Sequence, residues 1–130
     1  MENEKQQELM LKLGMFEQQI QQLQQQLQAV EQGIVELTSL NFGLDELKNG
    51  EGKEVLSPIG RGIFVKTKLV SEELTVDVGG KIFVKKSIPE TKIVIEGQIK
   101  KLNEIKEDLD KNLEKINQEL RKTIMGAQKR

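Results

Sequence analysis

Apolar residues recur at alternating intervals of three and four along two long segments of this 130-residue chain. Such spacing forms one stripe along a helix, and two stripes pack together as a coiled coil. The first stripe comprises Leu9, Leu13, Phe16, Ile20, Leu23, Leu27, Val30, Ile34, Leu37 and Leu44, with Asn41 as its polar member. The second comprises Ile95, Ile99, Leu102, Leu109, Leu113, Ile116 and Leu120. Lys106 interrupts the second stripe, and we expect the adjacent Ile105 to cover it. The sequence therefore predicts two coiled-coil helices.

The two helices are expected to fold back on each other as an antiparallel pair. At 1.5 Å per residue, the first stripe is about 54 Å long and the second, continued to Ala127, about 50 Å. Residues 1–48 contain eight acidic and three basic residues, whereas residues 88–130 contain eight acidic and ten basic residues. This opposite net charge favours pairing of the helices with each other. Both chain ends should then lie at one tip, with Phe42 and Leu44 facing the second stripe at the other end.

Composition argues against an enzyme. The chain contains no histidine and no cysteine, so it lacks the commonest general base, the commonest metal ligand and any thiol nucleophile. One carboxylate pair, at residues 72–73, falls in an expected turn without metal-ligating neighbours. The glycines at residues 60–62 and 79–80 fit neither a dinucleotide-binding fingerprint nor a Walker A loop. We expect no catalysis, no cofactor and no metal.

Charge and hydropathy also limit the partners. The net charge is −1, and no basic run exceeds two residues, which argues against a nucleic-acid partner. No segment approaches the roughly 18 apolar residues that a membrane-spanning helix requires, and the polar start lacks an apolar signal core. We therefore expect a soluble cytoplasmic protein with no membrane partner.

Between the two helical segments, the sequence changes to a pattern typical of β-strands. β-branched runs at residues 55–56, 63–70, 74–78 and 82–84 are separated by turn residues at 58–62, 71–73 and 79–80, which predicts two β-hairpins. Alternation predicts one apolar face, formed by Ile63, Val65, Thr67 and Leu69 in the first hairpin and by Leu74, Val76 and Val78 in the second. Fewer than 40 residues cannot bury such a face alone, so we expect strand addition between subunits.

The expected organisation is an α+β chain in three parts. Residues 1–48 form the N-terminal coiled-coil helix, residues 49–87 the β-hairpin oligomerisation module and residues 88–130 the C-terminal coiled-coil helix, with Ser87 as the expected cap of the latter. The predicted oligomer interface comprises Val55, Leu56, Ile59, Ile63, Val65, Leu69, Leu74, Val76, Val78, Ile82 and Val84.

Two motifs carry a resemblance to a known family. The run VLSPIGRG at residues 55–62 and the run VDVGG at residues 76–80, placed between two coiled-coil segments, resemble the α-class subunit of archaeal prefoldin. Arg61 departs from the small residue expected between its two glycines. The resemblance implies a single prefoldin domain whose hairpins assemble into an intersubunit β-barrel. It also implies a complex of two α subunits with four prefoldin β subunits, ATP-independent capture of unfolded polypeptides, and their delivery to group II chaperonin.

Apolar residues outside the stripes indicate a client-binding site independently of the resemblance. They gather near both ends of the chain, at Met10, Leu11 and Met15 and again at Ile124 and Met125, so an antiparallel pair brings them to one tip. Methionine suits surfaces that must fit many partners because its side chain is flexible. The predicted client-binding residues are Leu9, Met10, Leu11, Leu13, Met15, Phe16, Ile124 and Met125, of which Leu9, Leu13 and Phe16 also pack in the stripe.

Two other functions fit the same sequence. Strand pairing between subunits can close into a ring or continue into an open filament, so the chain could be a filament-forming α-class homologue. It could also be a structural coiled-coil scaffold without client binding, although polar tips would suit that role better.

Overall fold

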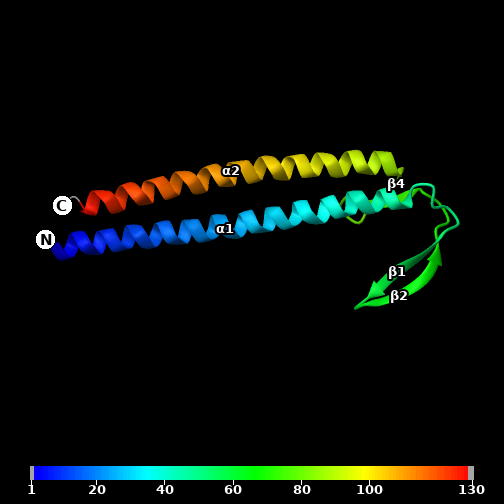
Figure 1. Ribbon diagram of the computed structural model, residues 1–130, viewed down its shortest axis with the longest axis horizontal. Helices are drawn as coiled ribbons and strands as arrows, with labels where there is room; N and C mark the ends of the chain where they lie inside the picture. Colours follow the sequence, from blue (N-terminus) through cyan, green and yellow to red (C-terminus); the bar gives the residue numbers. More distant parts are fainter. Residues whose placement is uncertain (1, 129–130) are drawn as a thin grey trace. The chain divides into compact units, whose positions relative to one another are not determined.

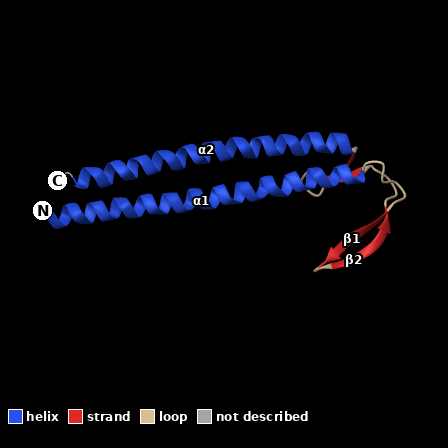
Figure 2. Cartoon of the chain, in the orientation of Figure 1, coloured by secondary structure: helices blue, strands red, loops and turns tan. Residues whose placement is uncertain are grey.

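The computed structural model describes residues 2–128, and it contains two long helices with two β-hairpins between them (Figures 1 and 2). The elements, in chain order, are α1 (Glu2–Leu47), β1 (Glu54–Gly60), β2 (Ile63–Lys68), β3 (Leu74–Asp77), β4 (Phe83–Lys86) and α2 (Ile88–Gln128). The predicted fold class, two packed helices joined by two hairpins, is confirmed. The chain divides into two compact units, one formed by residues 1–35 and 100–130 and the other by residues 36–99.

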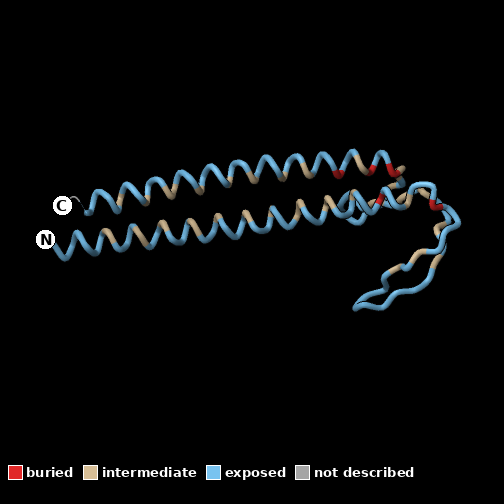
Figure 3. The backbone as a smooth tube through the Cα atoms, viewed as in Figure 1, coloured by how far each residue is buried: buried red, intermediate tan, exposed pale blue. Residues whose placement is uncertain are grey.

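In the first unit, α1 and α2 run side by side in opposite directions, and the start of α1 lies beside the end of α2 (Figure 1). Every residue of the two predicted stripes in this unit is partly buried, whereas most positions between them are exposed (Figure 3). A Cβ atom at Gly33 would lie 3.3 Å from Cδ1 of Leu102, so this glycine allows the helices to approach closely. The periodicity therefore predicted the seam between the helices correctly.

One expectation about this seam is wrong. Ile105 is 46% exposed and does not cover the gap in the second stripe. Lys106 itself is partly buried there, and its Nζ lies 3.7 Å from Oε1 of Glu31 on α1. A lysine can occupy a seam because its aliphatic stem packs on apolar neighbours while its ammonium group reaches an acidic partner.

The second unit contains the buried core. Leu44, Ile88 and Ile95 are buried, and the partly buried side chains that pack against them are Leu37, Leu47, Leu74 and Ile99. Leu44 thus meets the second stripe as expected, but Phe42 does not, because it is 70% exposed. Each residue turns the side-chain direction by about 100° around a helix, so a residue next to a seam position points away from the seam. Because Leu74 begins β3, the core links the second hairpin to the helices.

A charged cluster borders this core. Nζ of Lys92 on α2 donates a hydrogen bond of 2.6 Å to Oδ1 of Asp45 on α1, and Nζ of Lys48 lies 3.2 Å from the same oxygen. The hydrogen bond from Lys92, followed by that from Lys48, lowers the pKa of the Asp45 carboxyl below its ordinary value. The pair joins an acidic residue of one helix to a basic residue of the other, as the charge division predicted.

The first hairpin is longer than the sequence suggested. β1 pairs antiparallel with β2 from Glu54 opposite Lys68 to Gly60 opposite Ile63, with a register irregularity between Pro58 and Gly60. The expected turn at residues 58–62 therefore shrinks to residues 61–62. A bulge tolerates a proline, which cannot donate to the ladder, so the strand continues past it. Arg61 and Gly62 have φ angles of 50° and 77°, the positive values that two-residue hairpin turns favour.

The second hairpin and the start of α2 follow ordinary turn and capping chemistry. β3 pairs antiparallel with β4, and the turn between them contains Gly79 and Gly80 with positive φ angles of 109° and 62°. At the start of α2, the hydroxyl of Ser87 accepts a hydrogen bond from the backbone N–H of Glu90 and donates one to Oε1 of the same residue. The bond from the Glu90 N–H makes Ser87 the N-cap of α2, so the predicted cap is confirmed.

Candidate functional site

The ends of the first unit expose a cluster of large apolar side chains. Met10, Leu11 and Met15 on α1 are 73%, 68% and 55% exposed, and Ile124 and Met125 on α2 are 40% and 58% exposed. We call these five residues the tip patch. The other three predicted client-binding residues, Leu9, Leu13 and Phe16, are partly buried and belong to the seam. The predicted client-binding residues thus comprise five exposed side chains and three partly buried ones.

The antiparallel register places the two halves of the tip patch at the same level. Farther along the helices, one shallow depression is lined by Gln19, Gln22, Leu23 and Gln26 of α1 and by Asn112, Lys115, Ile116 and Glu119 of α2. Continuing this register toward the chain ends brings residues 10–13 opposite residues 124–127. At 1.5 Å per residue, Met10 and Met15 are only about 7.5 Å apart along the helix axis. The five exposed side chains therefore lie at a similar level of the helix pair, near the start of α1 and the end of α2.

The hairpins form a second apolar surface. Among the predicted interface residues, Val55, Leu69, Leu74, Val76 and Val84 are partly buried, and Leu56, Ile59, Ile63, Val65, Val78 and Ile82 are exposed. Within residues 2–128, each hairpin is a separate two-stranded sheet, so its outer edges pair with no other strand. Isolated two-stranded sheets are at best marginally stable, and free edges favour pairing with another chain. The hairpins thus have the features of an assembly module.

The first hairpin is apolar on both faces, which the alternation argument did not predict. Directly opposed residues share a face, and Ser57 lies opposite Val65 whereas Pro58 lies opposite Phe64. The faces therefore carry Val65 on one side and Phe64 on the other, and both side chains are exposed. The alternation argument assigned only the Val65 face of residues 63–70 to the interface and so left out Phe64, although the predicted interface residue Leu56 lies on the Phe64 face. Exposed Val70 and Phe83 were also left out, although their place in apolar runs was a usable signal.

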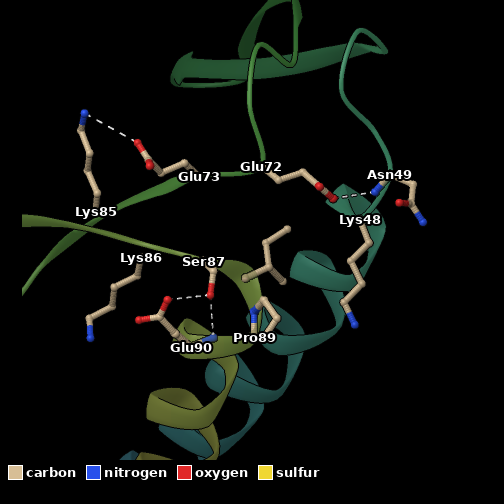
Figure 4. Close-up of a pocket in the computed structure, with 10 residues that line it drawn as sticks. Lys48, Asn49, Glu72, Glu73, Lys85, Lys86, Ser87, Pro89 and Glu90 are labelled. Atoms are coloured by element: carbon tan, nitrogen blue, oxygen red, sulfur yellow. Dashed lines mark hydrogen bonds and ion pairs between the residues drawn. The ribbon is translucent and has the colours of Figure 1, made fainter.

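A cavity of about 510 Å³ lies within the second unit, where the second hairpin meets the start of α2 (Figure 4). Its lining residues are Lys48, Asn49, Glu72, Glu73, Lys85, Lys86, Ser87, Ile88, Pro89 and Glu90. The backbone N–H of Asn49 donates a hydrogen bond of 2.6 Å to Glu72, and Lys85 lies 3.6 Å from Glu73. These lining groups bond to one another, which fits a role in holding the loop at residues 71–73 in place.

Residues 2–128 contain no group of three or more Asp, Glu, His or Cys side chains placed to hold a metal ion. Neither described helix has an apolar stretch long enough to cross a membrane. The tip patch and the hairpin surfaces remain as the features with the clearest means of binding other molecules.

Known proteins are similar to this chain in sequence and in the arrangement of helices and hairpins. A family model described as Prefoldin subunit matches residues 16–130. The prefoldin subunit alpha of Methanosphaera stadtmanae is 31% identical over 90 residues, which are 69% of this chain and 65% of that protein. The prefoldin subunit alpha of Methanococcus maripaludis is 30% identical over 117 residues, which are 89% of this chain and 80% of that protein. A chain of filamentous PFD from Methanocaldococcus jannaschii, solved by cryo-EM, matches with a TM-score of 0.78 and 27% identity, over 88% of this chain and 96% of that one.

Proposed function

Because this chain belongs to the prefoldin family, as an α subunit and thus a non-enzymatic chaperone component, we propose that it holds unfolded polypeptides at the tip patch without ATP. The observation that carries this proposal is the exposure of five large apolar side chains at the end of a coiled coil that is otherwise mostly polar outside its seam. Exposed apolar patches mark sites of interaction with other chains. One patch binds weakly, but several patches on one assembly bind a flexible client tightly in sum.

The proposed assembly contains two copies of this chain and four prefoldin β subunits, joined through the hairpins as a β-barrel. The free strand edges and the apolar faces of the first hairpin support this arrangement, because strand addition would pair the edges and closure into a barrel would bury an apolar face. In this proposal the complex delivers its clients to group II chaperonin in the cytoplasm. The proposal includes no cofactor and no nucleic-acid or membrane partner.

Client capture is tested by replacing Met10, Leu11, Met15 and Met125 together with glutamine. The complex with β subunits should keep its mass but lose suppression of the aggregation of a denatured client. The control replaces Val35 and Ile105, which are also exposed and apolar but lie away from the helix ends, and it should keep that suppression. Unchanged suppression by the fourfold variant would refute the tip patch as the client site and would favour a scaffold role.

Assembly through the hairpins is tested by one aspartate on each face of β3. Val76 lies opposite Val84 on the partly buried face, whereas Thr75 lies opposite Lys85 on the exposed face. Val76→Asp should disperse the complex, because a charge buried in an apolar interface lacks a partner. Thr75→Asp should leave it intact. An intact complex with Val76→Asp would argue against this face as the subunit interface.

The second possibility is a filament, favoured by the likeness to filamentous PFD. Head-to-tail strand pairing closes into a ring or continues as a fibre, depending on its geometry. Light scattering of this chain, alone and co-expressed with a prefoldin β subunit, distinguishes the closed complex from the filament. A discrete mass for the mixture supports the closed complex, and large, heterogeneous particles from this chain alone support the filament.

A further inference from the structure

The sulfur chemistry of this chain is concentrated in the tip patch. The chain contains four methionines and no cysteine, so thioethers are its only oxidisable sulfur groups. Three of the four, Met10, Met15 and Met125, lie in the described part, and all three belong to the tip patch. No seam residue and no residue of the buried core in the described part is a methionine. Oxidation of these three residues would therefore alter the proposed client site and leave the packing of the fold unchanged.

We propose that Met10, Met15 and Met125 form a reversible oxidation site that weakens client capture, an inference that rests on the proposed function. All three side chains are more than half exposed, so a small oxidant can reach each sulfur without opening the helix pair. Leu11 and Ile124, the other members of the tip patch, carry no oxidisable group. The tip patch thus contains both a part that oxidation changes and a part that it does not.

The proposed reaction is oxygen transfer from a hydroperoxide. The thioether sulfur attacks one oxygen of hydrogen peroxide, a sulfur–oxygen bond forms, and the oxygen–oxygen bond breaks with hydroxide as the leaving group, which then takes the proton from the transferred oxygen. The sulfur loses two electrons to become a sulfoxide, and hydrogen peroxide is reduced to water. Methionine sulfoxide reductases reverse the change with electrons from a thiol reductant.

Oxidation should weaken binding because it changes the character of the side chain. A sulfoxide is polar and accepts hydrogen bonds from water, so covering it with an apolar client segment requires its desolvation. The sulfoxide also lacks the apolar, polarisable sulfur with which the thioether packs against differently shaped partners. The loss at each tip is small, but the proposed assembly contains two copies of this chain, so the losses at its two tips combine.

The test uses the complex of the full chain with prefoldin β subunits and a matched variant, Met10→Leu, Met15→Leu and Met125→Leu. Leucine keeps the tip patch apolar and favours the helix, but it does not react with peroxide. Both complexes are treated with hydrogen peroxide, which is then removed before a denatured client is added. Met1 and the methionines of the β subunits are present in both complexes, so their oxidation affects both equally.

After oxidation, the amount of wild-type complex needed for half-maximal suppression of aggregation should rise on the order of tenfold, whereas the leucine variant should change by less than about twofold. Treatment with methionine sulfoxide reductases should restore the wild type. The inference is overturned if mass spectrometry finds sulfoxides at all three positions while suppression is unchanged, if the three positions resist oxidation, or if the leucine variant loses suppression equally. If neither complex suppresses aggregation before oxidation, the proposed function fails and the inference fails with it.

Discussion

The buried core at the base of the helices makes Leu44 the most informative position for a stability measurement. Leu44 is 7% exposed and packs with Ile88 and Ile95, so Leu44→Ala would leave a cavity between α1 and α2. Leucine-to-alanine changes at buried sites cost about 2–5 kcal/mol in the free energy of unfolding. This core has few fully buried members, so its neighbours can partly close the cavity. We therefore expect a loss of about 2–3 kcal/mol.

Leu40 provides a matched control on the same helix. It is 50% exposed, so Leu40→Ala removes side-chain carbons that are already half in water. At about 0.8 kcal/mol per buried methylene, and with the better helix propensity of alanine as an offset, this change should cost about 1 kcal/mol or less. The two variants carry the same substitution four residues apart, so the difference between them measures burial.

The assay is urea unfolding followed by circular dichroism, at one chain concentration because the stability of an oligomer depends on concentration. Hydrogen exchange adds a second test, because Leu74 of β3 packs on the same core and the β3–β4 amides should exchange faster in Leu44→Ala. Equal destabilisation by the two variants would refute the view that stability is concentrated in this core. Unchanged exchange in the second hairpin would refute its link to the core.

Three further predictions concern single polar groups. The side-chain oxygen of Asn41 is buried on the seam and accepts no hydrogen bond from any described residue, so Asn41→Leu should raise the free energy of unfolding by about 1–3 kcal/mol; a decrease in urea titration would contradict this. Ser87→Ala removes the cap of α2 and should lower the free energy of unfolding by about 0.5–2 kcal/mol. Ser87→Asp should keep most of the stability, because aspartate also caps helices, and equal losses in the two variants would argue against capping. The lowered pKa of Asp45 means that its contribution to stability is complete above its ordinary value of 3.8 and is lost as the pH falls through the lowered value. Asp45→Asn should therefore be less sensitive to acid in this range, and an unchanged pH profile of urea midpoints would contradict the role of its bond to Lys92.

The helix seam could be predicted from the sequence because its periodicity directly encodes burial. Each stripe residue lies on one side of a helix, so the spacing alone identifies which side chains face the partner. The cap at Ser87 was equally predictable, since a serine directly before a helix-forming run is a preferred N-cap residue. The exposure of Met10 and Met125 followed from the same logic, because apolar residues outside a seam have no partner within the helix pair.

The contacts that the sequence did not predict depend on which groups meet across elements. The extension of β1 past Pro58 depends on its register with β2, and a bulge leaves no local signal that distinguishes it from a turn. The partial burial of Lys106 depends on its pairing with Glu31, a residue of the opposite helix. Exposed Phe64 was left out of the interface because a two-stranded hairpin has two faces, and alternation alone does not say how many of them a partner covers.

In the proposed function, unfolded polypeptides are held at the tip patch. Its most direct test is to place a photo-crosslinking amino acid at position 11, and in a separate variant at position 35, in the complex with prefoldin β subunits. Leu11 and Val35 are both exposed on α1, but only Leu11 belongs to the tip patch. After illumination with a denatured client and no ATP, crosslinked client should form from position 11 and be nearly absent from position 35. Equal crosslinking from both positions, or crosslinking mainly from position 35, would contradict the account.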